Sequence, residues 1–239
     1  SGKSSLVVAL SALLTGDAAR QKQARKVFGP TVTGAVADAL APGKRGWHVI
    51  PVVGRRDDPV RAIGEALQEK GLVSRKLRNG WSEEKLLDVI SEAAADRTKG
   101  YGGLVLFVDE MGKFLEAAAQ EGADIYVFQQ LAEAAARSNG RLLVVGILHQ
   151  AFEEYAHRLS HEMRDEWAKI QGRFVDLAVN IAGDEQVDLI SRAIESDYHP
   201  TEPSKLSHQV AAVARRERPA DTDQFALTLE ACWPLHPVV

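Results

Sequence analysis

The chain has 239 residues, of which 45% are hydrophobic and 26% are charged, and its formal net charge is −4. This length can bury a substantial core, so we expect one domain with an appendage. A single cysteine, Cys232, excludes an internal disulfide and a cysteine-rich metal site, which favours a cytoplasmic location. No apolar run approaches the roughly twenty residues that span a bilayer, so we expect no membrane partner.

The chain begins with Ser1-Gly2-Lys3-Ser4-Ser5, which reads as the rear of a phosphate-binding loop, G-x-x-x-x-G-K-[ST], followed by an apolar helix that ends near Gly16. In such a loop the lysine reaches the β- and γ-phosphates, the Ser hydroxyl ligates Mg²⁺, and helix amides bind the anion. We therefore predict that residues 1–5 bind ATP and that Ser4 ligates Mg²⁺. A first strand and the glycine-rich front of the loop are expected ahead of Ser1, and without them we expect weak ATP binding.

Basic clusters are spread along the first hundred residues, which carry 17 Lys and Arg against 11 Asp and Glu; the remainder carries 12 against 22. Such clusters could contact nucleic-acid phosphates. We favour solvated helix faces instead, because no aromatic residues alternate with them as a stacking platform would require. The clusters are Arg20, Lys22, Arg25 and Lys26; Arg55 and Arg56; and Arg75, Lys76 and Arg78.

The middle of the chain alternates strands with helices, which predicts an α/β fold with a parallel sheet and helices on both faces. Expected strands cover 47–53, 103–108, 141–148 and 173–181. Expected helices cover 36–40, 57–70, 82–97, 124–138, 153–169 and 184–195. We place the ATPase core at 1–197, and a linker and the start of a helical lid or following domain at 198–239.

Two carboxylates follow the most apolar of these strands, because Asp109 and Glu110 come directly after the run from Leu104 to Val108. A continuous apolar run marks a strand that is buried on both faces, and ligands of parallel sheets bind at the carboxyl ends of the strands. Asp109 there can hold Mg²⁺, and Glu110 can polarise an attacking water. Of the residues just beyond, Lys113 and Phe114 either line the nucleotide mouth or begin a helix against the core.

Three further polar residues are candidates for the γ-phosphate. His149 and Gln150 follow the strand at 141–148, and either could act as a sensor that hydrogen-bonds the attacking water or the γ-phosphate. Arg173 could neutralise transition-state charge in its own subunit or a neighbour's. Alternatively, Arg173 pairs with Asp165 or Glu166 and fixes the chain at that point.

Several motifs together resemble the AAA-type P-loop ATPases of large bacterial proteins that are encoded in phage-defence loci, similar to the ATPases of BREX-type systems. They are Gly2-Lys3-Ser4-Ser5, the stretch from Asp109 to Glu116, Leu148-His149-Gln150-Ala151-Phe152, the stretch from Glu166 to Phe174, and Trp233-Pro234-Leu235-His236-Pro237. The resemblance implies ATP and Mg²⁺, the strand order 5-1-4-3-2, and a lid after Arg173. It also implies a longer parent protein that works with DNA or a defence complex, with a homo-oligomer as one possible state.

Three functions fit these patterns. The first is an ATPase motor or switch, in which Lys3 and Ser4 hold the triphosphate and Mg²⁺ and Glu110 activates water. A scaffold or signalling switch that binds ATP and rarely hydrolyses it would need Lys3 but not Glu110. A small-molecule kinase would need an acceptor pocket and an Arg-rich lid, and nothing between 57 and 99 is a convincing lid. We expect the ATPase.

Overall fold

A computed structural model describes residues 2–73, 80–121, 125–157, 159–177, 183–195, 197–198, 201–216 and 221–235. By contacts between residues the chain divides into two compact units, 2–177 and 178–239. The predicted domain boundary lies at residue 198, whereas this division falls at 177–178. No helix in the described part of the chain is long and apolar enough to cross a membrane.

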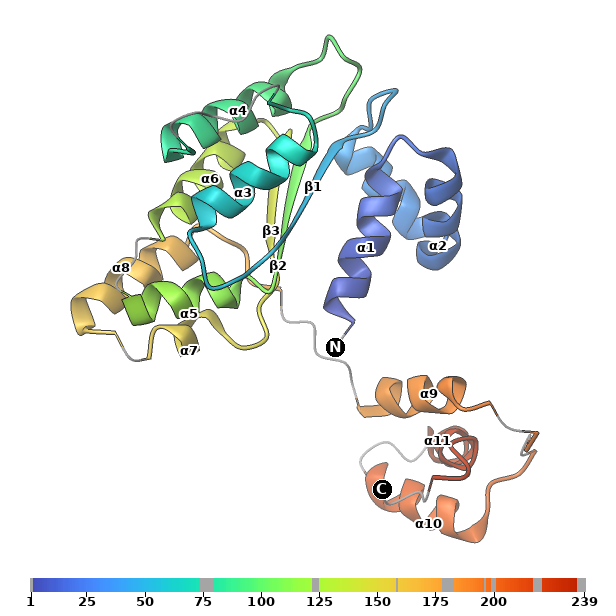
Figure 1. Ribbon diagram of the computed structural model, residues 1–239. Helices are drawn as coiled ribbons and strands as arrows, with labels where there is room; N and C mark the ends of the chain where they lie inside the picture. Colours follow the sequence, from blue (N-terminus) through green and yellow to red (C-terminus); the bar gives the residue numbers. More distant parts are fainter. Residues whose placement is uncertain are drawn as a thin grey trace. The chain divides into compact units, whose positions relative to one another are not determined.

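The larger unit is built on a parallel sheet of β1 (His48–Val53), β2 (Leu104–Asp109) and β3 (Leu142–Gly146), in the order β1-β2-β3 (Figure 1). Each strand was expected from its apolar, β-branched sequence. In the predicted order 5-1-4-3-2, β1, β2 and β3 correspond to strands 2, 3 and 4, which are neighbours in that order. The complete order 5-1-4-3-2 stays a prediction, since the described residues form only these three strands.

Helices cover both faces of the sheet (Figure 1). One face packs against α3 (Pro59–Glu69), α4 (Glu83–Ala95) and α6 (Tyr126–Arg137), and buries Ile50, Leu106 and Val108. The other face, with Val105 and Phe107, packs against α1 (Lys3–Leu14) and the end of α2 (Ala18–Leu40). Alternate residues of β2 therefore enter two separate cores, as the predicted double burial requires.

The helices that cross between the strands begin at caps that the sequence supplies. Asp58 accepts a hydrogen bond from the amide of Val60 at the start of α3, and Ser82 accepts one from Lys85 at the start of α4. Pro59 occupies the first turn of α3, where its missing N–H costs nothing. Beyond β2 the chain forms α5 (Gly112–Glu121), and beyond β3 it forms α7 (Phe152–Tyr155) and α8 (His161–Gln171).

Three predicted elements differ from the structure. Helix α2 spans Ala18–Leu40 rather than 36–40, starting at an Asp17 cap and kinking at Gly29, whose φ is 72°. The helix expected over 153–169 is broken between α7 and α8, because Ser160 caps a new helix. The fifth strand is absent from the described residues 173–177, which form turn and irregular backbone; its remainder lies outside the described residues.

The smaller unit contains α9 (Gly183–Ala193), α10 (Lys205–Ala214) and α11 (Thr222–Glu230) around a small core of Ala211, Ala226 and Leu229. Cys232 is buried beside this core with a free thiol, and burial raises the pKa of that thiol. The helix expected over 184–195 is present as α9, which packs against α11.

Candidate functional site

The predicted phosphate-binding residues lie at the start of α1, beside the end of β3. Gly2 precedes the helix as its cap residue and adopts the left-handed conformation with φ 66°. Among the described residues, no side chain forms a capping hydrogen bond at the start of α1. Gly2, Ser4 and Ser5 are exposed, whereas Lys3 is half-buried. The Lys3 ammonium donates a hydrogen bond of 2.8 Å to the carbonyl of Leu148, just beyond β3. The first turn of α1 is thereby fixed at the carboxyl edge of the sheet.

The carboxyl ends of β2 and β3 are tied together at the same edge. The amide of Ile147 donates to the carbonyl of Val108 at 2.9 Å, and the amide of Met111 donates to the carbonyl of Ile147 at 3.0 Å. Asp109 lies between Val108 and Met111, and Ile147 adjoins the carbonyl that binds the α1 lysine. Backbone contacts therefore connect the lysine of α1 with the acidic end of β2.

Glu110 has a backbone conformation that is uncommon for a residue with a side chain, with φ 53°. Its amide donates to the Asp109 carboxylate at 2.9 Å, and its own carboxylate forms an ion pair with Lys113 at the start of α5. The end of β1 passes so close that a Cβ on Gly54 would lie 2.1 Å from the Glu110 carbonyl oxygen. The turn after β2 is thus fixed by its neighbours, and such fixed, strained backbone is found preferentially at functional sites.

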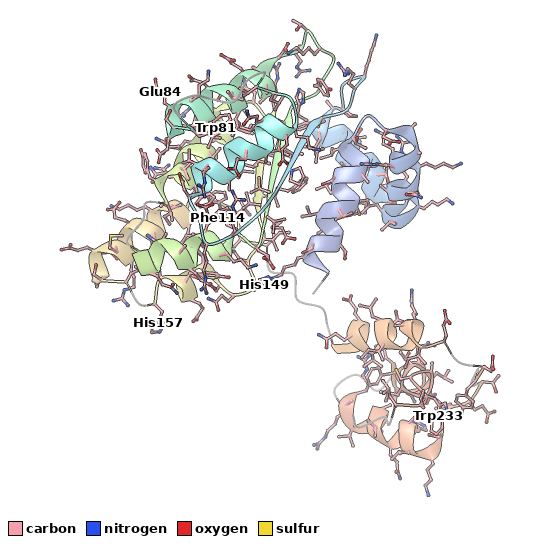
Figure 2. All side chains as sticks on the ribbon, viewed as in Figure 1. Trp81, Glu84, Phe114, His149, His157 and Trp233 are labelled. Atoms are coloured by element: carbon pink, nitrogen blue, oxygen red, sulfur yellow. The ribbon has the colours of Figure 1, made fainter. Side chains whose placement is uncertain are left out.

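The two candidate sensors, His149 and Gln150, are exposed in the loop that follows β3. Figure 2 places His149 at the same end of the sheet as the start of α1. Among the described residues neither side chain has a hydrogen bond or ion pair, so both are free to bind a ligand. The geometry does not single out one of them.

Arg173 lies in a turn that follows α8, and its guanidinium pairs with Glu133 of α6 at 3.0 Å. The sequence alternative of a partner at Asp165 or Glu166 is wrong, because His161 pairs with Asp165 and Lys169 pairs with Glu166, each within α8. The Arg173 ion pair joins α8 to α6 and makes no contact with the lysine of α1. Its assignment to the γ-phosphate stays a prediction.

The ion pair of Glu110 with Lys113 and the carbonyl partner of Lys3 were not anticipated. The first had a signal, because residues three apart on a helical turn can pair. The second had none, because 145 residues separate the two groups. Phe114 is buried in the core and does not line a nucleotide mouth. Ser1 lies outside the described residues.

Ser4 and Asp109 are the residues that would hold Mg²⁺. Ser4 is exposed in the first turn of α1, and Asp109 is half-buried at the end of β2. One Asp109 carboxylate oxygen accepts from the Glu110 amide, and among the described residues the other has no hydrogen bond. A hydroxyl and a carboxylate oxygen are ligands that Mg²⁺ accepts, with water and phosphate completing the shell. The described part of the chain holds no group of three or more His, Cys, Asp or Glu side chains suited to a metal. The donor set fits a cation shared with phosphate.

Comparisons of the chain with protein-family models, with curated proteins and with solved structures found no match.

Proposed function

We propose that the larger unit binds ATP with Mg²⁺ at the carboxyl edge of its sheet and hydrolyses it. The observation that carries the proposal is the hydrogen bond from Lys3 to the Leu148 carbonyl, which holds a Gly-Lys-Ser helix start beside the acidic end of β2. A motif of this kind is weak by itself. Its position at the same edge of a parallel sheet as two carboxylates supports phosphoanhydride hydrolysis.

Each residue then has a distinct task. The exposed amides of the first turn of α1 bind phosphate oxygens, and Lys3 exchanges its carbonyl partner for the β- and γ-phosphates. Ser4 and Asp109 would hold Mg²⁺, which neutralises charge on the phosphates when bound. Glu110 orients water and accepts its proton, and His149 or Gln150 contacts the γ-phosphate.

A switch with little turnover is the second candidate, and the Glu110 ion pair favours it. A carboxylate that is held by Lys113 has one oxygen engaged by the ammonium, so less of it is available to water. One variant separates the two candidates: Lys113→Met should raise ATP turnover if the ion pair restrains Glu110, as in the switch, and should leave turnover unchanged if the ion pair does not limit hydrolysis, as in the ATPase.

The sequence resemblance extends the proposal to the parent protein. There ATP hydrolysis would drive conformational change in further domains, within a homo-oligomer or a DNA-linked defence complex.

The test is ATP binding by calorimetry with Lys3→Ala, compared with Lys85→Ala as the matched control. Lys85 is an exposed lysine on α4, so Lys85→Ala removes the same charge far from the carboxyl edge of the sheet. We expect binding to be lost in the first variant and kept in the second. Equal affinity in Lys3→Ala and the unmodified chain would overturn the assignment of the phosphate-binding residues.

A further inference from the structure

A second charged surface lies at the amino edge of the sheet, opposite the ATP site proposed above. It is made by six exposed cations on the first half of α2, the turn before β1 and the end of α3, which we call the basic surface. Among the described residues none of the six has a carboxylate within ion-pair distance, whereas Arg55, Arg61 and Arg137 elsewhere on the chain do. The basic surface comprises Lys22, Arg25, Lys26, Lys44, Arg45 and Lys70.

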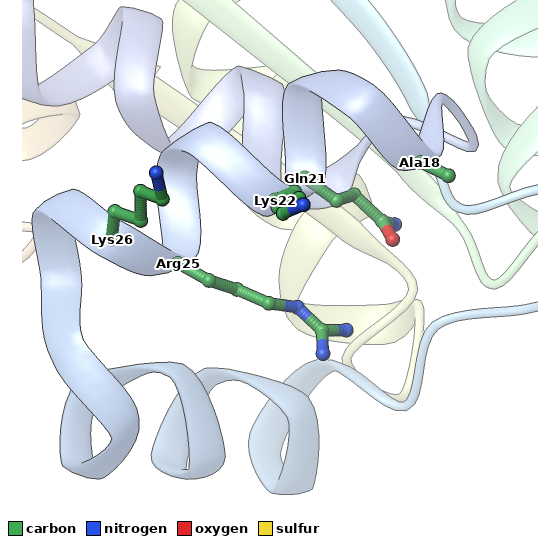
Figure 3. A pocket seen from close by; sticks show the side chains of 5 residues that line it. All are labelled: Ala18, Gln21, Lys22, Arg25 and Lys26. Atoms are coloured by element: carbon green, nitrogen blue, oxygen red, sulfur yellow. The ribbon is translucent and has the colours of Figure 1, made fainter.

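Three of these cations share one side of α2. Lys22, Arg25 and Lys26 are spaced by three and four residues, so their side chains emerge on the same face of the helix. Figure 3 shows them around a shallow hollow that Ala18 and Gln21 complete. No acidic residue occurs between Ala18 and Asp38, so this face keeps its positive charge.

The other three cations line a neighbouring hollow. Lys44, Arg45 and Lys70 stand around it together with residues 15–17. The two hollows adjoin each other, because the Gln21 amide donates to the carbonyl of Thr15 at 2.6 Å.

An acid is also present in the second hollow, but its charge is already engaged. The Asp17 carboxylate accepts hydrogen bonds from the amides of Ala19 and Arg20 as the cap of α2, and it pairs with the Arg20 guanidinium. The net charge around both hollows therefore remains positive.

The second hollow also contains an aromatic pair that sequence spacing could not reveal. The rings of His48 and Tyr101 are stacked with their centroids 3.7 Å apart, although 53 residues separate them. The Arg45 guanidinium lies 4.8 Å from the centre of the Tyr101 ring. Burial lowers the pKa of His48, and the positive charges of Lys99 and Arg45 lower it further against the opposing charge of Asp96, which favours the neutral imidazole.

We propose that the basic surface binds a nucleic-acid strand, with backbone phosphates on the α2 cations and an unpaired base against the His48 and Tyr101 rings. Unpaired cations beside aromatic rings are the combination by which proteins bind single strands without sequence preference. An acidic peptide would use the cations but would gain nothing from the rings. A duplex would use the phosphate contacts alone, because its bases are stacked inside the helix.

The test is fluorescence anisotropy of a labelled 20-nucleotide single strand, titrated with the full chain at several salt concentrations. The first variant combines Lys22→Ala, Arg25→Ala and Lys26→Ala. Its matched control combines Lys85→Ala, Arg97→Ala and Arg164→Ala, which removes three exposed cations from other helices and loops of the same unit. Within the described part of the chain these three also have no carboxylate partner. Circular dichroism verifies that both fold.

We expect the first variant to weaken binding at least tenfold and to lower the dependence of log K on log salt by about two, since each single-strand phosphate contact contributes about 0.7. The control should change binding less than threefold. Tyr101→Leu, which keeps an apolar side chain but removes the ring, should weaken the single strand about fivefold or more and leave the duplex unchanged.

Four results would overturn the proposal: no binding at low salt, an equal loss in both triple variants, equal binding of strand and duplex with no effect of Tyr101→Leu, or displacement of the strand by poly-glutamate at equal charge. The last would identify an acidic protein as the partner. Lys3→Ala should leave strand binding intact, so this inference can fail or hold independently of the proposed ATP site.

Discussion

Glu110 combines a left-handed backbone with a carboxylate that is held at the mouth of the proposed ATP site. The residues on either side of Glu110 are fixed by hydrogen bonds, because the Asp109 carbonyl accepts from the Gly54 amide and the Met111 amide donates to the Ile147 carbonyl. The Glu110 side chain therefore projects from a backbone that is held in place at φ 53°. Strain of this kind costs roughly 1–3 kcal/mol and persists only where the surroundings impose it. A defined position is what a water-activating carboxylate needs.

The first prediction concerns this carboxylate. Glu110→Gln keeps the shape of the side chain but cannot accept a proton, so we expect phosphate release to fall by roughly 10²–10⁴ while ATP affinity is unchanged. Steady-state phosphate release and calorimetry measure the two quantities. A variant that binds and turns over ATP like the unmodified chain would show that Glu110 is not the base.

Variants of Arg173 can separate a structural role from a role in ATP turnover, because the ion-pair partner of Arg173 is Glu133. Arg173→Ala and Glu133→Gln break the same ion pair, which at this half-exposed position contributes about 1 kcal/mol or less. Because Glu133→Gln also removes the ion pair with Arg137, we expect it to lose at least as much thermal stability as Arg173→Ala, and we expect only Arg173→Ala to lose ATP turnover. Equal turnover in the two variants would assign Arg173 to joining α8 with α6.

At the scale of elements, the contact between α3 and the chain ahead of α4 depends on one glycine. Gly64 is buried in α3, and a Cβ there would lie 2.2 Å from the indole ring of Trp81. The indole therefore packs directly on the helix backbone. No side chain larger than hydrogen fits without moving the helix or the ring.

Replacement of a glycine by alanine should therefore have opposite effects on the free energy of unfolding in α3 and in α2. Gly64→Ala overpacks the contact with Trp81 and should lower the free energy of unfolding by about 1–3 kcal/mol. Gly34→Ala in α2, where a Cβ meets no atom within 4 Å, should raise it by about 0.5–1 kcal/mol. Urea unfolding measures both. A destabilised Gly34→Ala variant, or a neutral Gly64→Ala variant, would contradict the packing.

At the scale of the whole molecule, one carboxylate joins two segments of the smaller unit. Glu230 accepts hydrogen bonds from the hydroxyls of Ser207 and Tyr198 and from the amide of Ser204, which tie the segment before α10 to α11. These bonds, with those to the Ser204 and Ser207 side chains as the largest cause, lower the pKa of Glu230 to about 2.

The sign of the resulting pH dependence follows from this shift. The folded pKa lies below the ordinary value of 4.5, so the stabilisation is complete above pH 4.5 and is lost as the pH falls toward 2. The protection of the described amides in 183–235 from hydrogen exchange, taken relative to the intrinsic exchange rate at each pH, should fall over this interval. In Glu230→Gln this protection should already be low at pH 6 and should change little on acidification. A pH profile of protection in this variant that equals that of the unmodified chain would contradict the role of Glu230.

The sequence alone was sufficient for the three strands of the sheet and the capped helices α3 and α4, because those features depend on local patterns. An apolar run makes a buried strand, and an Asp or Ser before a helix caps it, wherever the chain goes afterwards. The length of α2 and the break between α7 and α8 were missed since their polar, weakly periodic sequences carry little of that signal.

Only the tertiary structure decided which distant residues meet. The hydrogen bond between Lys3 and Leu148, the ion pair between Arg173 and Glu133, and the stacking of His48 on Tyr101 each join segments that are far apart in the chain. Such contacts follow from how the strands align and which helix covers which face, and no local pattern encodes that. The same limit hid the aromatic pair beside the basic surface: His48 begins β1 and Tyr101 lies ahead of β2, and the pairing of these two strands brings the rings together.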